Sequence, residues 1–283
     1  MAETNYPRKL KCELYNDSMQ SWKCYPIQKA QLIIADVPYN VGTQFYGSNP
    51  SWYIGGDNKN GESKLAGKAA FTSDFNFNLY EYFHFCSRLM KKEPKRGGAR
   101  GRSSDAPCMI VFCSFQQMPV LIDAAKKQGF IHYIPLTFIK KSSPQALKAN
   151  MRVCGATERA LLFYRGYLPK FNPIKKDGTH GMVLDWFEYE RDGKDIPKIH
   201  PTQKPVKVLK RLIEIFTDPY DVVIDPCFGS GSTARACQEL GRNFYGFEIN
   251  KQFYRRAVDE MLLKPEQIVI NSKDDNQMTI FEA

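Results

Sequence analysis

The chain has 283 residues, 43% of them hydrophobic, and 40 Lys and Arg against 30 Asp and Glu give it a net charge of +10. This composition excludes a wholly disordered chain, and no apolar run approaches the roughly 20 residues that a membrane span needs. The N-terminal stretch lacks the apolar core of a secretory signal, so we expect a soluble, intracellular protein. The positive charge favours a polyanion such as nucleic acid as partner, but charge alone fits many functions.

Eight cysteines are scattered along the chain. None forms a Cys-x-x-Cys pair, and no histidine lies at zinc-site spacing from two of them. We therefore expect free, mostly buried thiols and no metal site.

The first half of the chain alternates between predicted strands and helices. In chain order these are strands at 11–15 and 31–36, a helix at 78–92, a strand at 108–113, a helix at 118–130 and strands at 131–140 and 159–166. The stretch from Val41 to Asp74 has little periodicity and is predicted to be a long loop. The stretch from Tyr167 to Ile199 is predicted to be irregular.

The second half continues the alternation. A helix is predicted within 200–217 with Thr202 as its N-cap, followed by a strand at 221–225, a glycine turn, a helix at 232–241, a strand at 243–248 and a helix at 251–263. Strands that alternate with helices in this way predict an α/β fold, with a mostly parallel sheet covered on both faces.

The glycine turn follows the pattern Gly229-x-Gly231-x-x-Ala234 between a strand and a helix. Glu248 ends the next strand, 19 residues after Gly229. In nucleotide-binding βαβ units such glycines let the backbone approach the ligand, and the acid on the second strand binds ribose hydroxyls. We therefore favour a ribose-bearing cofactor over a purely structural turn.

Asp225, at the entrance to the turn, discriminates between cofactors. A pyrophosphate about 4 Å from its carboxylate would be repelled by about 4 kcal/mol at an effective dielectric constant near 20, whereas an ammonium group would be attracted. S-adenosylmethionine has a ribose, an α-ammonium group and no phosphate, so it fits better than NAD. The alternative is that Asp225 only caps a local turn.

Three motifs resemble those of the DNA amino-methyltransferases. The stretch "DVPY" at 36–39 is similar to their Asp-Pro-Pro-Tyr motif, "DPCFGSGST" at 225–233 to their S-adenosylmethionine turn, and "HPTQKP" at 200–205 matches a third motif letter for letter. The catalytic motif precedes the cofactor motif, which resembles the permuted β arrangement of the family. The resemblance implies a doubly wound, mostly parallel, seven-stranded Rossmann-like methyltransferase sheet with a small inserted target-recognition segment.

The resemblance also implies a mechanism. An exocyclic base amine is a poor nucleophile, and two acceptors for its hydrogens, the carboxylate of Asp36 and the backbone carbonyl of Val37, would make it reactive. Pro38 would hold that carbonyl in place, and Tyr39, with Asn40 beside it, would bind a base flipped out of the duplex. Val37 departs from the proline that is usual in the family, which weakens the local restraint.

The cofactor residues follow from the same resemblance. Asp17 would contact the adenine of S-adenosylmethionine, with an Asx-turn as the alternative. Thr202 and Lys204 would bind its carboxylate, and His200 would be a positioning residue. The full predicted cofactor set is Asp17, His200, Thr202, Lys204, Asp225, Phe228, Gly229, Gly231 and Glu248.

The target of the predicted enzyme is adenine N6 in duplex DNA, because cytosine-N4 members of the family more often carry serine at the position of Asp36. N4-cytosine methylation is the main alternative. A non-catalytic DNA-binding protein of the same fold, and a methyltransferase acting on RNA or on protein glutamine, are the others.

The predicted organisation has four parts: a catalytic half at 1–140, the last sheet strands with the recognition segment at 141–199, a cofactor-binding half at 200–271 and a tail at 272–283. The tail residues Gln277–Phe281 resemble the motif by which bacterial proteins dock on the replication sliding clamp. The expected location is the cytoplasm of a bacterium or phage-infected cell, at the nucleoid, with restriction-modification as one context. A homodimer is left open.

Overall fold

The computed structural model describes residues 10–38, 77–95, 105–141, 146–148, 153–173, 179, 181–200 and 202–264. The predicted long loop, Tyr39, Asn40 and the tail motif Gln277–Phe281 lie outside these residues, as does most of the basic stretch at 95–102. Within the described ranges, no helix has both the length and the apolar character needed to cross a bilayer.

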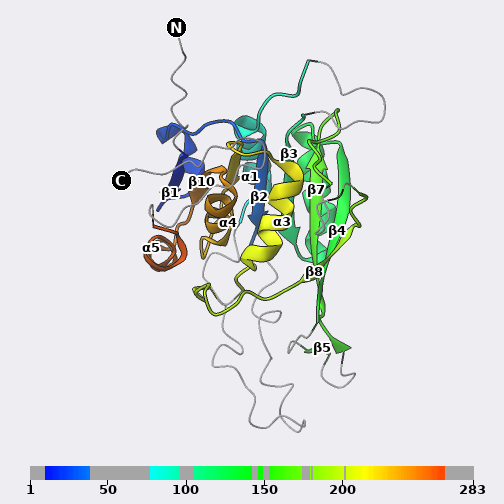
Figure 1. Cartoon of the computed structure of the whole chain (residues 1–283). Coiled ribbons are helices and arrows are strands. Elements are labelled where there is room, and N and C mark those ends of the chain that lie inside the picture. The colour runs from blue at the N-terminus through cyan, green and yellow to red at the C-terminus, as the bar shows by residue number, and fades with distance from the viewer. Residues whose placement is uncertain are drawn as a thin grey trace.

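Within the described residues, eight strands form one twisted sheet and two short strands form a separate hairpin (Figure 1). The sheet order is β1-β10-β9-β2-β3-β7-β4-β8, and β7 runs antiparallel to both of its neighbours while the other pairs are parallel. The strands are β1 (Cys12–Tyr15), β2 (Leu32–Asp36), β3 (Cys108–Cys113), β4 (His132–Lys140), β5 (Ala146–Lys148), β6 (Val153–Cys154), β7 (Thr157–Tyr164), β8 (Trp186–Tyr189), β9 (Val222–Asp225) and β10 (Asn243–Phe247).

Helices cover both faces of the sheet, as predicted, and α3 and α4 lie on the face toward the viewer in Figure 1. They are α1 (Leu79–Leu89), α2 (Met118–Lys127), α3 (Val206–Phe216), α4 (Ser232–Leu240) and α5 (Lys251–Arg256), which continues into a π-helical turn at Ala257–Met261. Short 3-10 helices occupy Met19–Cys24 and Phe115–Gln117.

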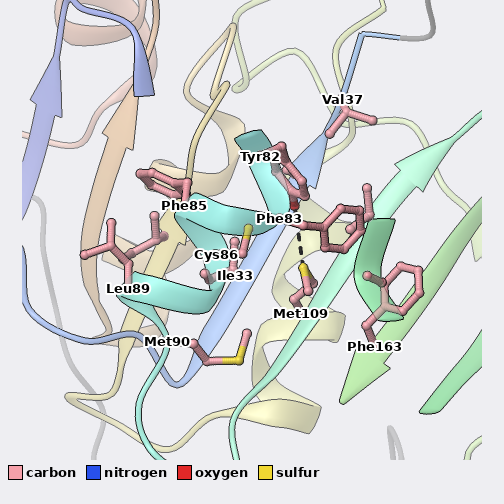
Figure 2. Close-up of a cluster of buried hydrophobic side chains, with 14 of the residues drawn as sticks. Ile33, Val37, Tyr82, Phe83, Phe85, Cys86, Leu89, Met90, Met109 and Phe163 are labelled. Carbon is pink, nitrogen blue, oxygen red and sulfur yellow. Dashed lines mark hydrogen bonds between the residues drawn. The ribbon is translucent and has the colours of Figure 1, made fainter. Parts of the chain in front are cut away.

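The central strand β2 shows why the fold needs two layers of helices. Its side chains alternate between two hydrophobic clusters: Ile33 and Ala35 pack with α1 and α2, whereas Leu32 and Ile34 pack with α3 and α4. Figure 2 shows part of the first cluster, where Ile33 of β2 lies among side chains of α1. All four of these β2 side chains are buried, so β2 is fixed from both sides.

Two predictions about this architecture are corrected by the structure. In the part of the chain that the structure describes, the main sheet has eight strands rather than seven, because the segment predicted to be irregular contributes β8. This strand has only four residues and lies at the sheet edge, so it lacks the buried apolar run that reveals a strand in a sequence. Its anchor is Phe187, whose ring stacks on Phe138 of β4 at 5.3 Å.

The N-cap prediction for the helix after "HPTQKP" is wrong. Helix α3 begins at Val206, with Pro205 at the N-cap position, so Thr202 lies outside the helix. Because proline has no side-chain acceptor, the first N–H groups of α3 are satisfied from elsewhere. The carboxylate of Asp192 accepts from Val206 N at 2.9 Å and from Lys207 N at 3.3 Å.

Candidate active site

The two predicted motifs meet at one edge of the sheet. Strands β2 and β9 are parallel neighbours, with Leu32 opposite Val223 and Ile33 opposite Ile224, and each strand ends on an acid, Asp36 or Asp225. The two strand tips therefore lie side by side. The chain continues from β2 to β3 on one side and from β9 to β10 on the other, so this is the switch point where open α/β sheets bind ligands.

Asp36 is held through both its side chain and its backbone. The ammonium nitrogen of Lys204 lies 2.6 Å from Asp36 Oδ2, and the thiol of Cys227 donates to the Asp36 carbonyl oxygen at 3.6 Å. The Asp36 side chain is 27% exposed, whereas Lys204 is only 7% exposed. The Asp36 side chain is therefore only partly exposed at the strand tip, with its Oδ1 atom buried, and its counter-ion lies beneath the surface.

The residues after Asp36 are anchored in a way that replaces the missing proline. The Val37 side chain is buried in the first hydrophobic cluster, close to α1 (Figure 2). The carbonyl of Pro38 accepts a hydrogen bond from Gln117 Nε2 at 2.8 Å. Gln117 is itself held, because its Oε1 accepts from the backbone of Ser114 at 3.1 Å in a capping box. Burial and this hydrogen bond restrain the peptide that a second proline would otherwise stiffen.

Replacing Gln117 by leucine is expected to lower kcat about fivefold, because one hydrogen bond to the loop after Asp36 is worth roughly 1 kcal/mol. Cofactor affinity should stay unchanged, since Gln117 contacts the loop after Asp36. Single-turnover kinetics and calorimetric cofactor titration measure the two quantities. Gln128→Leu, at the far end of α2 where Gln128 accepts from Ser87 at 3.2 Å, is the matched control. Equal rates for the two variants would contradict a role for Gln117 in holding the loop.

The glycine turn has the backbone conformation that its sequence predicts. Gly229 and Gly231 have φ values of 52° and 80°, the left-handed region that favours glycine. Glu248 closes the turn, because its Oε2 accepts from Gly229 N at 3.0 Å and its Oε1 from Asn250 N at 2.6 Å. Burial raises the pKa of Glu248. Phe228, also predicted to meet the cofactor, is buried and donates from its backbone N–H to Phe247 at 3.0 Å.

Asp225 makes the contacts expected of a turn cap. Its Oδ1 accepts from Cys227 N at 3.1 Å and its Oδ2 from the Thr233 hydroxyl at 2.6 Å. Burial raises the pKa of Asp225 to about 7, and the charges of Asp36 and Glu248 add to this effect. The local capping role is therefore present, and three carboxylates converge on the turn.

His200 and Thr202 lie together beside the turn. The His200 Nδ1 accepts from Thr202 N at 3.3 Å and lies 3.1 Å from the Thr202 hydroxyl, and the ring makes an edge contact with Phe253 at 4.5 Å. A Cβ added at Gly229 would come within 3.9 Å of the His200 ring. Burial, and then the charge of Lys204, lower the pKa of His200 to about 4, so the ring is neutral near pH 7.

Asp17 reaches the same edge from β1 but points its carboxylate into its own turn. It accepts from Ser18 N at 2.6 Å, from the Ser21 hydroxyl at 3.0 Å and from the Tyr25 hydroxyl at 2.8 Å. The hydrogen bond from Tyr25 is the main reason that the pKa of Asp17 is lowered. These contacts are local, but the backbone N–H that Asp17 binds is one residue on and not two, so they do not form the predicted Asx-turn. A contact with a cofactor adenine remains a prediction.

The structure adds residues that sequence reasoning did not single out. Gln117 binds the Pro38 carbonyl, Cys227 binds the Asp36 carbonyl, and Glu158 on β7 lies 3.1 Å from Lys204 Nζ. Lys204, predicted to reach the cofactor, lies on Asp36 instead. The one available signal for Glu158 was an acid at the start of an otherwise apolar strand, "TERALLFY".

Fold and site together define a class of protein. A doubly wound sheet carries a glycine turn, and Glu248 after the following strand binds that turn. A second acid, Asp36, lies at the tip of the neighbouring strand, and its charge acts on Asp225 at the entrance to the turn. This combination is that of an α/β enzyme that brings a nucleoside-bearing cofactor to a substrate at the switch point.

Comparison with known proteins names the family. The N6_N4_Mtase family, described as DNA methylase, matches residues 30–259, and the chain belongs to this family. It is similar to "DNA adenine methyltransferase YhdJ" of Escherichia coli K12, with 27% identity over 90% of this chain and 84% of that protein. It is 50% identical to "Putative methylase YubD" of the same organism, over 52% of this chain and 58% of that protein.

A solved structure shows the same fold. The "M1.HpyAVI-SAM complex" superposes with a TM-score of 0.59 at 23% identity, covering 87% of this chain and 96% of that one. At this identity the likeness concerns the fold, and it agrees with the predicted Rossmann-like methyltransferase sheet.

Proposed function

We propose that this DNA methylase transfers a methyl group from S-adenosylmethionine to the N6 amine of adenine in duplex DNA. The observation that carries the proposal is the pairing of β2 with β9, which brings Asp36 beside the glycine turn. One ligand on the turn and another on Asp36 would then lie within reach of a single methyl group. Holding two reactants in line in this way supplies much of the rate in bimolecular transfers.

The residues at the turn fit this cofactor. The charges of Asp36 and Glu248 act on Asp225, so the turn is rich in carboxylates and unsuited to a pyrophosphate. A cation placed there would favour the ionised form of Asp225, whose pKa burial has raised. When bound, S-adenosylmethionine supplies an electrophilic methyl group. Glu248 would hold its ribose, and the glycines of the turn would admit it closely.

The substrate amine would be prepared by the strand tip. Asp36 and the Val37 carbonyl would each accept one of its hydrogens, which draws the nitrogen toward a reactive geometry. Val37 burial and the Gln117 bond to Pro38 support this role because they fix the peptide in advance. Tyr39 and Asn40 would bind the flipped base, with stacking offsetting part of the cost of a few kcal/mol for removing it from the duplex.

The preference for adenine rests on Asp36 and on the likeness to a relative named as an adenine methyltransferase. N4-cytosine methylation is the alternative, since the family name covers both amines. Duplex DNA of mixed sequence is incubated with labelled S-adenosylmethionine, digested to nucleosides and analysed by mass. Labelled 6-methyladenine is the expected product. Labelled 4-methylcytosine would move the target, and unlabelled DNA with both wild type and Asp36→Ala would refute the enzyme.

The finer points of organisation and partners are further proposals. We assign the β arrangement of the family from the motif order, with residues 1–140 as catalytic half, 141–199 as recognition segment and 200–271 as cofactor-binding half. The β5–β6 hairpin projects beyond the sheet (Figure 1) and would contact DNA together with Tyr167–Ile199. We also propose clamp docking through Gln277–Phe281, a homodimer and a nucleoid location. Size-exclusion chromatography with and without purified clamp tests the first two.

A further inference from the structure

A chain of alternating charges leads inward from the proposed catalytic acid. Lys204 Nζ lies 2.6 Å from Asp36 Oδ2 and 3.1 Å from Glu158 Oε2, so it bridges the two carboxylates. The other oxygen of Glu158 lies 2.5 Å from Lys140 Nζ. Asp36 lies on β2, Glu158 on β7 and Lys140 on β4, and Lys204 precedes α3. The Lys204 side chain is only 7% exposed.

We propose that Lys204 is a positioning residue for Asp36: held by Glu158, it orients the catalytic carboxylate and keeps it ionised, and it does not serve the cofactor's carboxylate group. The proposal rests on the proposed function, in which Asp36 must accept a hydrogen from the base amine. Only the ionised carboxylate offers acceptors at both oxygens, so a protonated Asp36 would fail in that role.

The electrostatics explain why the bridge matters. Asp36 and Glu158 share one buried cation, so without Lys204 they would face each other as like charges, and one of them would take up a proton. Glu158 is secured in its charged form. Burial alone would raise its pKa, but Lys204 and Lys140 outweigh this and lower the pKa below its ordinary value.

The position of Lys204 also argues against a role at the cofactor. Its ammonium group contacts two carboxylates and lies 5.1 Å from the centre of the Phe112 ring, which favours a cation there. To reach a ligand on the glycine turn, Lys204 would have to abandon a buried ion pair, and breaking such a pair is strongly destabilising.

Other titratable groups near Asp36 must be separated from the pair in any pH experiment. They are Lys204 before α3, Glu158 on β7, Lys140 on β4, Tyr189 on β8, Cys113 on β3, and Asp225 and Cys227 at the end of β9. Burial raises the pKa of Cys113 to about 12 and raises those of Cys227 and Tyr189 further, so these three stay neutral in the working range. Asp225, with a pKa of about 7, does titrate there.

The test compares Lys204→Met with the charge-balanced double variant Lys204→Met/Glu158→Gln. We measure the pH dependence of kcat on duplex DNA and the Kd for S-adenosylmethionine by calorimetry. In Lys204→Met the acidic limb of kcat should move up by about 1 to 3 pH units with the Kd unchanged, because the shift expected for a carboxylate that loses a close cation is of this size. In the double variant the limb should return toward the wild-type position, because the like-charge repulsion is gone.

The outcomes separate this proposal from the proposed function. If Lys204→Met raises the Kd and leaves the acidic limb of kcat unmoved, Lys204 serves the cofactor and the proposal is overturned. If the limb moves but the added Glu158→Gln does not restore it, Lys204 acts on Asp225, which also overturns the proposal. Lys127→Met, on the exposed end of α2, controls for the loss of a positive charge. If Lys204→Met does not fold, the double variant decides by its Kd alone: an unchanged value supports the proposal and a weakened one overturns it. A wild-type protein that transfers no methyl group would instead refute the function.

Discussion

Replacing Asp36 by asparagine is expected to reduce methyl transfer by roughly 10²- to 10⁴-fold, the range found when a positioned catalytic group is removed. Asparagine keeps the shape of the side chain, but one of its two acceptor oxygens becomes an NH₂ donor. With its oxygen turned toward Lys204, the amide would present donors to the amine hydrogens, so the amine would not be activated. Single-turnover transfer to duplex DNA measures the loss.

The control for Asp36→Asn must remove a carboxylate without touching the site. Asp123→Asn does so, because Asp123 is exposed on α2, where it pairs with Lys127 at 2.9 Å and accepts from the Tyr80 hydroxyl of α1 at 3.0 Å, and neither partner belongs to the site. Cofactor affinity should be retained in both variants, since the glycine turn is intact. Near-wild-type transfer by Asp36→Asn would mean that a different group activates the amine.

Replacing Gly231 by alanine is expected to weaken cofactor binding tenfold or more. A side chain at φ 80° costs about 1–2 kcal/mol, so the free turn would relax away from this conformation. Cofactor binding would then have to restore it, and about 1.4 kcal/mol corresponds to a factor of ten in affinity. The added Cβ would also lie 3.0 Å from the Cβ of Ala257. The start of α4 would therefore be pushed away from the π-helical turn that begins at Ala257. Calorimetric titration with S-adenosylmethionine and a thermal melt measure the two effects.

Gly129→Ala separates the backbone cost from the ligand effect. Gly129 follows α2 with φ 83°, and a Cβ there would meet nothing within 4 Å. Both variants should lose stability through the unfavourable φ, but only Gly231→Ala should lose cofactor affinity. If Gly231→Ala bound the cofactor as tightly as Gly129→Ala, the turn would not be its binding element.

Much of the fold could be predicted because local pattern and burial agree over most elements. The runs that end at Asp36, Cys113 and Asp225 are buried on both sides, and such continuous apolar runs are typical of central parallel strands. Strand β8 escaped prediction because an edge strand of four residues has no such run. The start of α3 was misplaced because its cap comes from Asp192, 14 residues before Val206.

For the site, the sequence by itself determined the chemistry at each strand tip: an acid followed by a restrained peptide at 36–38, and a glycine turn with its acid at Glu248. These are local properties, because residue type and φ preference act within a few positions. Only the tertiary structure decided which charges meet. Lys204 and Asp36 are 168 positions apart, and Gln117 and Pro38 are 79 apart. Such contacts depend on the order of the strands in the sheet, which local patterns do not specify. They also depend on burial, because the Lys204–Asp36 ion pair is stronger where water is excluded.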